Sequence, residues 1–481
     1  MTVRFLSAPD SETQVRGEIV FEDAPASGKC ESPELWGKKG KVALIPGDLH
    51  NSNNPNNPDK IMTALVGGGK RGKFSDAVLR DVAAEFTRAC GAHSCSRLSL
   101  ELSLDGEAQK FSRAASGAAA EGALAGAYSF DKYLGKSRKK LPLESFALVG
   151  GDEAGLERGR IVGEAESYAK DLCNEPGNVV NPLTFTLLAT KLSAQLGLDC
   201  SISDEKEIAE AGMNALWSVG KGSATPPRLV HLVYRPEGPA RKRVAIVGKG
   251  VTFDSGGLCV KTREGIKTMK HDKSGACVMM GVMKAVAELK LPIEVNGIAG
   301  LVENMPDGGA YRPDDVIRAM NGKTIEILNT DAEGRLTLAD VLTFASKLEP
   351  DAILDVATLT GTAKAALGSY TAALLCDDDA LSAALVRAAA IAGERLHRLD
   401  MDDERLREGL NGVHADLRQA SPDGGGTIIG GMFLREFVDP SIPWAHIDIA
   451  ATGWYDKNFG VYSKGSSAYS LRTIVEYLSS L

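Results

Sequence analysis

Four acidic residues in the second half of the chain have the chemistry that metal ions require. Together with three nearby cations, the set is Lys249, Asp254, Lys261, Asp272, Asp331, Glu333 and Arg335. Four carboxylates brought into one cleft cannot all stay ionised without raised pKa values or bound cations. Two divalent ions would supply four compensating charges, and a carboxylate shell suits magnesium, manganese or zinc. Such paired ions can activate water and polarise a carbonyl.

Each segment alone has a more ordinary interpretation. An Asp directly before a helix, such as Asp272, is typical of an N-cap, and Asp331 alone would be a solvated loop acid. The glycines at 248–250 do not complete a dinucleotide-binding fingerprint, because Phe253 stands where the third glycine is needed. His271 is interpreted as a structural residue. The chemistry therefore depends on whether folding brings these segments together.

Predicted strands and helices alternate along the chain, which indicates an α/β fold. Strands are predicted at 42–46, 145–149, 243–247, 293–301, 324–328, 352–357 and 444–449, and helices at 74–89, 114–128, 153–172, 276–289, 336–348 and 381–392. We expect a mostly parallel central sheet flanked by helices, with ligands bound where strands end. Lys249 and Asp254 would then lie in a Gly-rich loop after one strand. Extended backbone at 331–335 would point Asp331, Glu333 and Arg335 the same way.

The composition is typical of a soluble globular protein, and the length fits about three domains or two larger ones equally well. The chain has 481 residues, 43% hydrophobic and 25% charged, and a net charge of −8, which argues against nucleic acid as a partner. No apolar run is long enough to span a membrane, and no secretory signal is seen, so we expect a cytoplasmic protein. The eight cysteines form no CxxC pair and are expected to be reduced. We predict a smaller N-terminal α/β domain at 1–155, a connecting helix and loop at 156–180, and a catalytic domain at 181–481.

Several segments, in order, resemble the leucyl aminopeptidase family, also called cytosol aminopeptidases. Residues 329–336, Asn-Thr-Asp-Ala-Glu-Gly-Arg-Leu, match that family's signature octapeptide throughout. Further segments similar to family blocks are 248–257, 303–306, 310–313, 357–361, 415–417 and 444–450. The resemblance is strong over residues 160–470 and weak before them. Lys273 departs from the uncharged residue expected after Asp272.

The resemblance implies a two-metal exopeptidase that removes N-terminal residues from peptides. It assigns one ion to Lys249, Asp254, Asp272 and Glu333, and the other to Asp254, Asp331 and Glu333. A lysine that ligates a metal must be neutral, so its pKa must fall. The ions are expected to be manganese or zinc, with magnesium as a further candidate.

Roles for the remaining residues also follow from the resemblance. Lys261 would stabilise the tetrahedral oxyanion, and Arg335 would hold a bicarbonate ion as general base. Positions that would line a pocket for a Leu-like first residue are Met269, Thr358, Leu359 and Gly361. The family also implies a homohexamer.

Two other functions use the same residues. A two-metal phosphoester hydrolase would cleave phosphate esters, although the chain has few extra basic residues for such substrates. A DNA-binding or structural hexamer with secondary peptidase activity would use the basic cluster at 136–140 and would bind DNA in a salt-dependent way.

Overall fold

The computed structural model describes residues 3–23, 37–45, 61–104, 107–135, 143–421 and 424–481. Its contacts divide the chain into two compact units. The first comprises Met1–Ser167 and Tyr455–Gly465, and the second comprises Tyr168–Trp454 and Ser466–Leu481. In the described part of the chain, none of the helices combines the length and apolar character that a bilayer-spanning segment needs.

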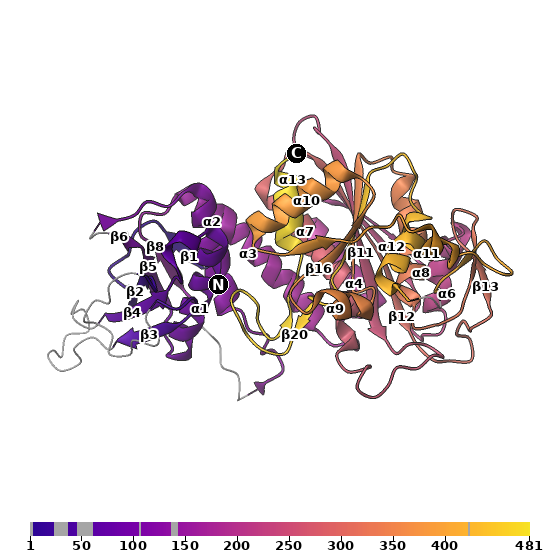
Figure 1. The fold of residues 1–481 in the computed structure, drawn as a ribbon, viewed down its shortest axis with the longest axis horizontal. Helices are drawn as coiled ribbons and strands as arrows, with labels where there is room; N and C mark the ends of the chain where they lie inside the picture. The colour runs from indigo at the N-terminus through magenta and orange to yellow at the C-terminus, as the bar shows by residue number, and fades with distance from the viewer. Residues whose placement is uncertain (1–2, 24–36, 46–60, 105–106, 136–142, 422–423) are drawn as a thin grey trace. The chain divides into compact units, whose positions relative to one another are not determined.

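The first unit is built on a six-stranded sheet in the order β1-β8-β5-β2-β4-β3 (Figure 1). All neighbouring strands are parallel except β3 and β4. The six strands are β1 (Arg4–Leu6), β2 (Val15–Val20), β3 (Val42–Ile45), β4 (Met62–Gly67), β5 (Arg97–Glu101) and β8 (Ser145–Leu148), and a separate two-stranded sheet consists of β6 (Ser103–Leu104) and β7 (Glu107–Ala108). Its helices are η2 (Arg71–Lys73), α1 (Asp76–Ala92), α2 (Arg113–Ala127) and most of α3 (Glu153–Asn174).

The second unit contains an eight-stranded sheet in the order β17-β16-β19-β15-β11-β12-β10-β9. The four central strands are parallel to one another, whereas β9, β10 and β16 join through antiparallel pairs. The strands are β9 (Asp199–Ser203), β10 (Arg228–Tyr234), β11 (Arg243–Asp254), β12 (Glu294–Asn304), β15 (Ala352–Ala357), β16 (Ala372–Cys376), β17 (Leu396–Arg398) and β19 (Trp444–Asp448).

Helices cover both faces of this sheet. The longer ones are α4 (Pro182–Leu196), α7 (Ser274–Leu289), α8 (Glu333–Ser346), α10 (Asp379–Ala392), α12 (Gly426–Arg435) and α13 (Leu471–Ser479). Shorter helices of this unit are α5 (Glu205–Glu210), α6 (Asn214–Gly220), η4 (Met269–Lys273), α9 (Gly361–Leu367) and α11 (Glu404–Glu408). A separate three-stranded sheet consists of β13 (Val316–Arg318), β14 (Thr324–Glu326) and β18 (Leu417–Arg418). The two strands β20 (Trp454–Tyr455) and β21 (Gly465–Ser466) pair with each other, and each includes one residue of either unit.

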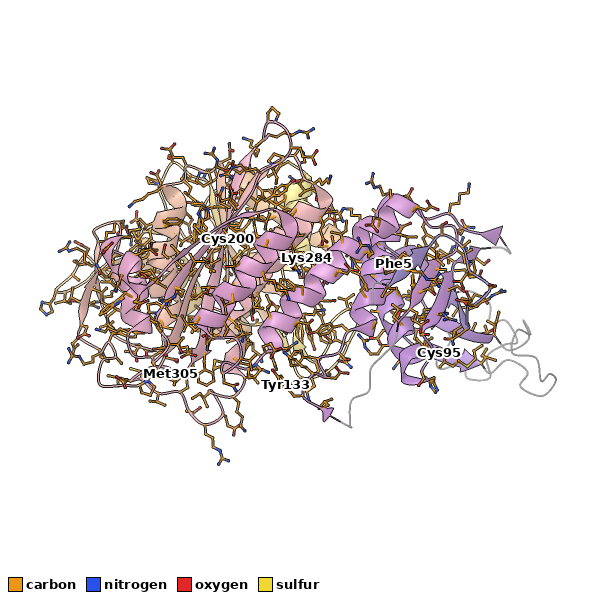
Figure 2. The ribbon with its side chains drawn as sticks, turned by 180° about the vertical axis from the view of Figure 1, so that it is seen from behind. Phe5, Cys95, Tyr133, Cys200, Lys284 and Met305 are labelled. Atoms are coloured by element: carbon orange, nitrogen blue, oxygen red, sulfur yellow. The ribbon has the colours of Figure 1, made fainter. Side chains whose placement is uncertain are left out.

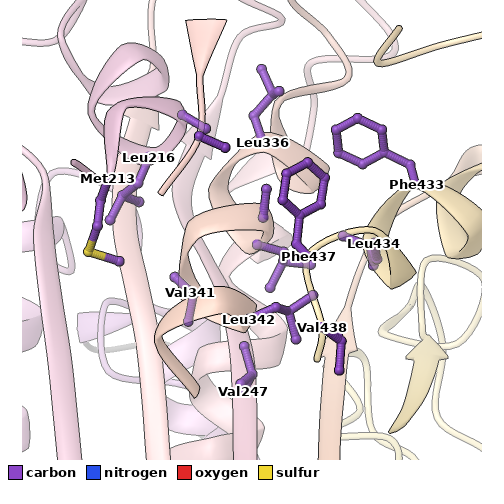
Figure 3. Close-up of a cluster of buried hydrophobic side chains, with 14 of the residues drawn as sticks. Met213, Leu216, Val247, Leu336, Val341, Leu342, Phe433, Leu434, Phe437 and Val438 are labelled. Atoms are coloured by element: carbon purple, nitrogen blue, oxygen red, sulfur yellow. The ribbon is translucent and has the colours of Figure 1, made fainter. Parts of the chain in front are cut away.

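A large apolar cluster fixes one of these helical layers against the sheet. Its members include Val247 of β11, Leu216 of α6, Val341 and Leu342 of α8, and Phe437, which follows α12 (Figure 3). All these side chains are buried. Burying them stabilises the fold by roughly 1.5–3 kcal/mol each. The first turn of α8 is thereby held at a fixed height above β11.

The expected α/β fold with a parallel-rich sheet is confirmed, but three local predictions are wrong. The strand at 243–247 continues to Asp254, so Lys249 lies on β11 rather than in a loop. The predicted strand at 324–328 is only the three-residue β14, which belongs to a separate three-stranded sheet. Helix α8 begins at Glu333, so the backbone of 331–335 is not extended.

The described cysteines are all free, as expected. Cys95 belongs to the first unit and Cys200 to β9 of the second (Figure 2). Cys30 and the basic cluster at 136–140 lie outside the described residues.

Candidate metal centre

The proposed ligands come from four segments of the second unit. Lys249 and Asp254 stand on β11, and Asp272 stands in η4, directly before α7. Asp331 lies in the turn before α8, and Glu333 is the first residue of that helix. An acidic residue in the first turn is favoured there by the helix dipole. These segments meet beside the carboxyl ends of the central parallel strands.

Close backbone packing brings η4 to β11. A Cβ atom at Gly275, in the first turn of α7, would lie 2.0 Å from the Val356 carbonyl oxygen and 2.7 Å from the Lys249 backbone nitrogen. Only glycine allows α7 to begin this close to β11 and β15. Because η4 directly precedes α7, this close packing places the Asp272 side chain in contact with that of Lys249.

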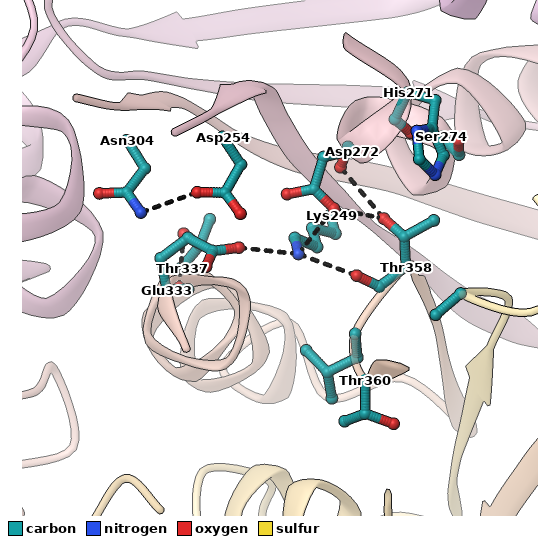
Figure 4. Close-up of polar contacts among 12 residues, drawn as sticks. Lys249, Asp254, His271, Asp272, Ser274, Asn304, Glu333, Thr337, Thr358 and Thr360 are labelled. Atoms are coloured by element: carbon teal, nitrogen blue, oxygen red, sulfur yellow. Dashed lines mark hydrogen bonds and ion pairs between the residues drawn. The ribbon is translucent and has the colours of Figure 1, made fainter. Parts of the chain in front are cut away.

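Three buried carboxylates converge in this place. Asp254, Asp272 and Glu333 each offer an oxygen, and the three oxygens lie within 4.8 Å of one another. Lys249 Nζ lies 2.9 Å from an oxygen of Asp272 and 2.9 Å from one of Glu333 (Figure 4). The same nitrogen donates to the Thr358 carbonyl oxygen at 2.9 Å. Four of the predicted ligands therefore form one cluster.

Asp331 is joined to that cluster through a second lysine. Lys261 Nζ lies 2.7 Å from Asp254 Oδ2 and 2.5 Å from Asp331 Oδ1. Asp331 is not within the group of three carboxylates, and its side chain is 32% exposed. Two of the three ligands predicted for the second ion, Asp254 and Asp331, are thus paired with one ammonium group.

The charges in the cluster strongly affect one another. Burial, followed by the charge of Glu333, raises the pKa of Asp254 to about 6, although Lys261 opposes the shift. Burial disfavours the charged form of Lys249, but the carboxylates of Asp272 and Glu333 outweigh it and raise the pKa of Lys249. Burial raises the pKa of Glu333 even though Lys249 opposes it. Buried carboxylates in such contact require cations.

The donor set fits a metal ion. Asp272 Oδ2 is buried and accepts no hydrogen bond from any described residue. Its other oxygen accepts a hydrogen bond from the Thr358 hydroxyl at 2.6 Å, and Asn304 Nδ2 donates to Asp254 Oδ1 at 2.8 Å (Figure 4). Such hydrogen bonds orient the ligands of a metal. Asn304 was not predicted as a site residue, although it lies in a segment similar to a family block.

Arg335 occupies a neighbouring buried position. Its Nη1 donates to the Gln419 carbonyl oxygen at 2.5 Å, and the guanidinium lies 6.0 Å from the Phe433 ring centre. Its Nε is buried and donates to no described residue. Burial lowers the pKa of Arg335 to about 10, while the charges of Glu333 and Asp448 oppose the decrease. An unused, buried N–H of a cation is suited to an anion.

The four predicted pocket residues lie in two places. Met269 is the first residue of η4 and lines a cavity of about 600 Å³ together with Phe253 and Met305. Thr358, Leu359 and Gly361 follow β15 and do not line that cavity. His271 is buried and donates from Nδ1 to the Thr268 carbonyl oxygen at 2.6 Å, which fits a structural residue.

Comparisons with known proteins agree on one family. The family model described as "Cytosol aminopeptidase family, catalytic domain" matches residues 167–475, and the corresponding N-terminal domain model matches 32–137. The chain is 47% identical to "Probable cytosol aminopeptidase" of Aquifex aeolicus (strain VF5), over 93% of this chain and 89% of that protein. It is 40% identical to the protein of the same name from Microcystis aeruginosa (strain NIES-843 / IAM M-2473), over 98% of this chain and 95% of that protein.

A solved structure is similar along the same length. "Bottromycin maturation enzyme BotP in complex with Mn" aligns with a TM-score of 0.88 and 35% identity, covering 97% of this chain and 99% of that one. The family models and relatives together span both units. The chain belongs to the cytosol aminopeptidase family and is a hydrolase of that family, a metal-dependent aminopeptidase.

Proposed function

We propose that this aminopeptidase removes the first residue of peptides at a centre of two divalent ions. One ion would be held by Lys249, Asp254, Asp272 and Glu333, and the other by Asp254, Asp331 and Glu333. The observation that carries the proposal is the convergence of three buried carboxylates within 4.8 Å of one another. Manganese or zinc, with magnesium as a further candidate, suits these oxygens and one amine.

Two bound dications would polarise the scissile carbonyl and make a water molecule more acidic. Lys249 would have to release its proton on ligating an ion. Lys261, which already lies between Asp254 and Asp331, is placed to stabilise negative charge that develops on the carbonyl oxygen. Thr358 would keep Lys249 and Asp272 in position through its two oxygens.

Arg335 would hold a bicarbonate ion as the general base. Its buried and unused Nε supports this role, because a bidentate anion could accept from it. Held there, such an anion would supply a proton acceptor for the attacking water. Glu333 and Asp448 help to keep the guanidinium charged.

Leu-like first residues are the proposed substrates. Two apolar residues lie near the proposed ligands. Met269 belongs to the same short helix, η4, as Asp272. Leu359 follows Thr358, whose carbonyl oxygen accepts a hydrogen bond from Lys249. A free N-terminal amine offers an additional ligand that an internal peptide bond lacks, which explains removal of single terminal residues. A homohexamer is proposed from the family resemblance alone. The cytoplasmic location expected from the sequence is also proposed, with support from the relatives' name, cytosol aminopeptidase.

The test uses the full chain loaded with manganese and a matched pair of peptides. Leu-Gly-Gly should be hydrolysed to free leucine, whereas N-acetyl-Leu-Gly-Gly should not, because acetylation removes the amine. Asp-Gly-Gly should react much more slowly than Leu-Gly-Gly. Hydrolysis of p-nitrophenyl phosphate at a rate similar to that of Leu-Gly-Gly would instead support a phosphoester hydrolase.

A further inference from the structure

The carboxylate of Asp448, at the end of β19, accepts four hydrogen bonds. Oδ1 accepts from Leu359 N at 3.1 Å and from Ala450 N at 3.0 Å. Oδ2 accepts from Thr360 N at 3.1 Å and from Thr360 Oγ1 at 2.6 Å. The side chain is completely buried. Its charge helps to keep Arg335 protonated, but none of the proposed roles in catalysis or metal binding uses its four hydrogen bonds.

The backbone that Asp448 holds belongs to neither a strand nor a helix. Residues 358–360 lie between the end of β15 at Ala357 and the start of α9 at Gly361. The N–H groups of Leu359 and Thr360 would be left without partners if the carboxylate were absent, at a substantial cost in a buried place. Asp448 therefore determines the path of this short segment.

This segment begins with the residue that contacts two proposed metal ligands. The carbonyl oxygen of Thr358 accepts from Lys249 Nζ at 2.9 Å, and its hydroxyl donates to Asp272 Oδ1 at 2.6 Å (Figure 4). Both contacts can form at once only if the Thr358 backbone is held in one position relative to β11 and η4. The next two residues along the chain are the ones tied to Asp448.

We propose that Asp448 is a positioning residue of the metal centre, which acts by fixing Thr358 against Lys249 and Asp272. The inference rests on the proposed function, because it assigns those two residues to an ion. A carboxylate is required at this position, since its two oxygens serve four donors. An asparagine has a single oxygen, so its NH₂ group would face two of the N–H or O–H donors. Two donors cannot bond to each other, so these contacts would be lost.

Asp340 of α8 provides a matched control. It is also completely buried, and it accepts from Leu216 N at 2.9 Å and from Met320 N at 2.8 Å. It lies seven residues after Glu333, or about 10 Å along the helix. Its loss should destabilise the fold in a similar way without touching the metal centre.

The experiment compares Asp448→Asn with Asp340→Asn in the full chain. It measures manganese affinity by competition with a chelator, kcat and KM for leucine p-nitroanilide at saturating manganese, and the temperature of unfolding. Asp448→Asn should lose about 10- to 100-fold in manganese affinity or in kcat, the usual range for residues that orient ligands. Asp340→Asn should stay within about 2-fold of the wild type in both, with a comparable decrease in unfolding temperature.

Thr358→Val tests the route of the effect. If Asp448 acts through Thr358, the double variant Asp448→Asn/Thr358→Val should lose clearly less than the product of the two single losses, because Thr358→Val removes the contact with Asp272 and keeps the carbonyl contact with Lys249. If the double variant's loss equals the full product of the two single losses, the inference is overturned. Equal losses of manganese affinity and kcat in Asp448→Asn and Asp340→Asn would overturn it as well.

A milder pair keeps the test decisive if Asp448→Asn does not fold. Thr360→Val removes the hydroxyl that donates to Asp448, and Thr360→Ser keeps it. Thr360→Val should weaken manganese binding by about 3-fold or more and Thr360→Ser should bind as the wild type does, and equal affinities of these two variants would overturn the inference.

Failure of this inference can be told apart from failure of the proposed function. A wild type that binds no manganese would contradict the proposed function as well, whereas unaffected variants beside an active wild type would contradict this inference alone.

Discussion

The side-chain nitrogen of Lys249 lies 2.9 Å from a carboxylate oxygen of Glu333, and both side chains are buried. One residue comes from a central strand and the other from the first turn of a helix on its face. The ammonium charge of Lys249 compensates carboxylates that would otherwise repel one another. Any ion that takes this place must therefore displace a proton.

Manganese affinity should increase with pH. The pKa of Lys249 is raised, so the ion-free enzyme keeps this proton through the neutral range, and ligation releases it. The logarithm of the association constant should rise by about one unit per pH unit from this group between about pH 7 and 9. Asp254, with a pKa of about 6, should add to the slope only at lower pH. Calorimetric titrations at several pH values measure the slope.

Lys249→Met supplies the control for this pH dependence. Removing the amine should decrease the slope by about one unit per pH unit and also weaken binding, because one ligand is lost. An unchanged slope in this variant would show that the released proton comes from elsewhere.

Asp331→Asn should lower kcat by more than about 100-fold and reduce manganese uptake, because it changes a proposed ligand rather than a group that supports one. The fold should persist, since this side chain is partly exposed and precedes α8. Kinetics with leucine p-nitroanilide and metal analysis check both effects. Asp351→Asn, in the exposed ion pair with Lys242, should leave them unchanged. Wild-type turnover in Asp331→Asn would refute its assignment.

Lys261→Met should decrease kcat by about 100- to 1000-fold, as expected on removal of a group that stabilises an oxyanion. KM should change much less, because the interaction is made mainly in the transition state. Lys267→Met is the matched control, since Lys267 lies in the same connection between β11 and η4 and pairs only with exposed Glu264 among the described residues. A large rise in KM with unchanged kcat would assign Lys261 to substrate binding instead.

Activity should depend on bicarbonate in the wild type and not in Arg335→Met. In buffers freed of carbon dioxide, added bicarbonate should restore wild-type kcat, by about 100-fold if it acts as the general base. The variant should stay at the low rate with or without bicarbonate. A wild type that is indifferent to bicarbonate would contradict the role proposed for Arg335.

The sequence predicts the centre of the fold better than its edges. Strand β15 has the predicted bounds, Ala352–Ala357, because five of its six residues form a short, buried apolar run that only Asp355 interrupts. Strand β10 was not predicted, since its polar residues such as His231 interrupt the apolar pattern of an antiparallel strand near the sheet edge. Strand β16 was likewise missed.

The candidate site shows a similar contrast. The acidic residues were identified from their types, and the structure brings three of them together. The start of α8 was placed too late, so Glu333 and Arg335 were expected to share a direction, whereas Glu333 contacts Lys249 and Arg335 contacts Gln419. Asp448 was not predicted as a site residue, although it lies in the family-like segment 444–450, because its partners Leu359 and Thr360 lie far from it in sequence.

The central claim is tested most directly by counting bound metal while activity is followed. The protein is stripped with a chelator, manganese is added in steps, and bound manganese per chain is measured together with the rate on leucine p-nitroanilide. We predict no activity in the stripped protein and full activity at two manganese ions per chain. Full activity without metal, or saturation of both binding and activity at one ion, would contradict a dinuclear centre.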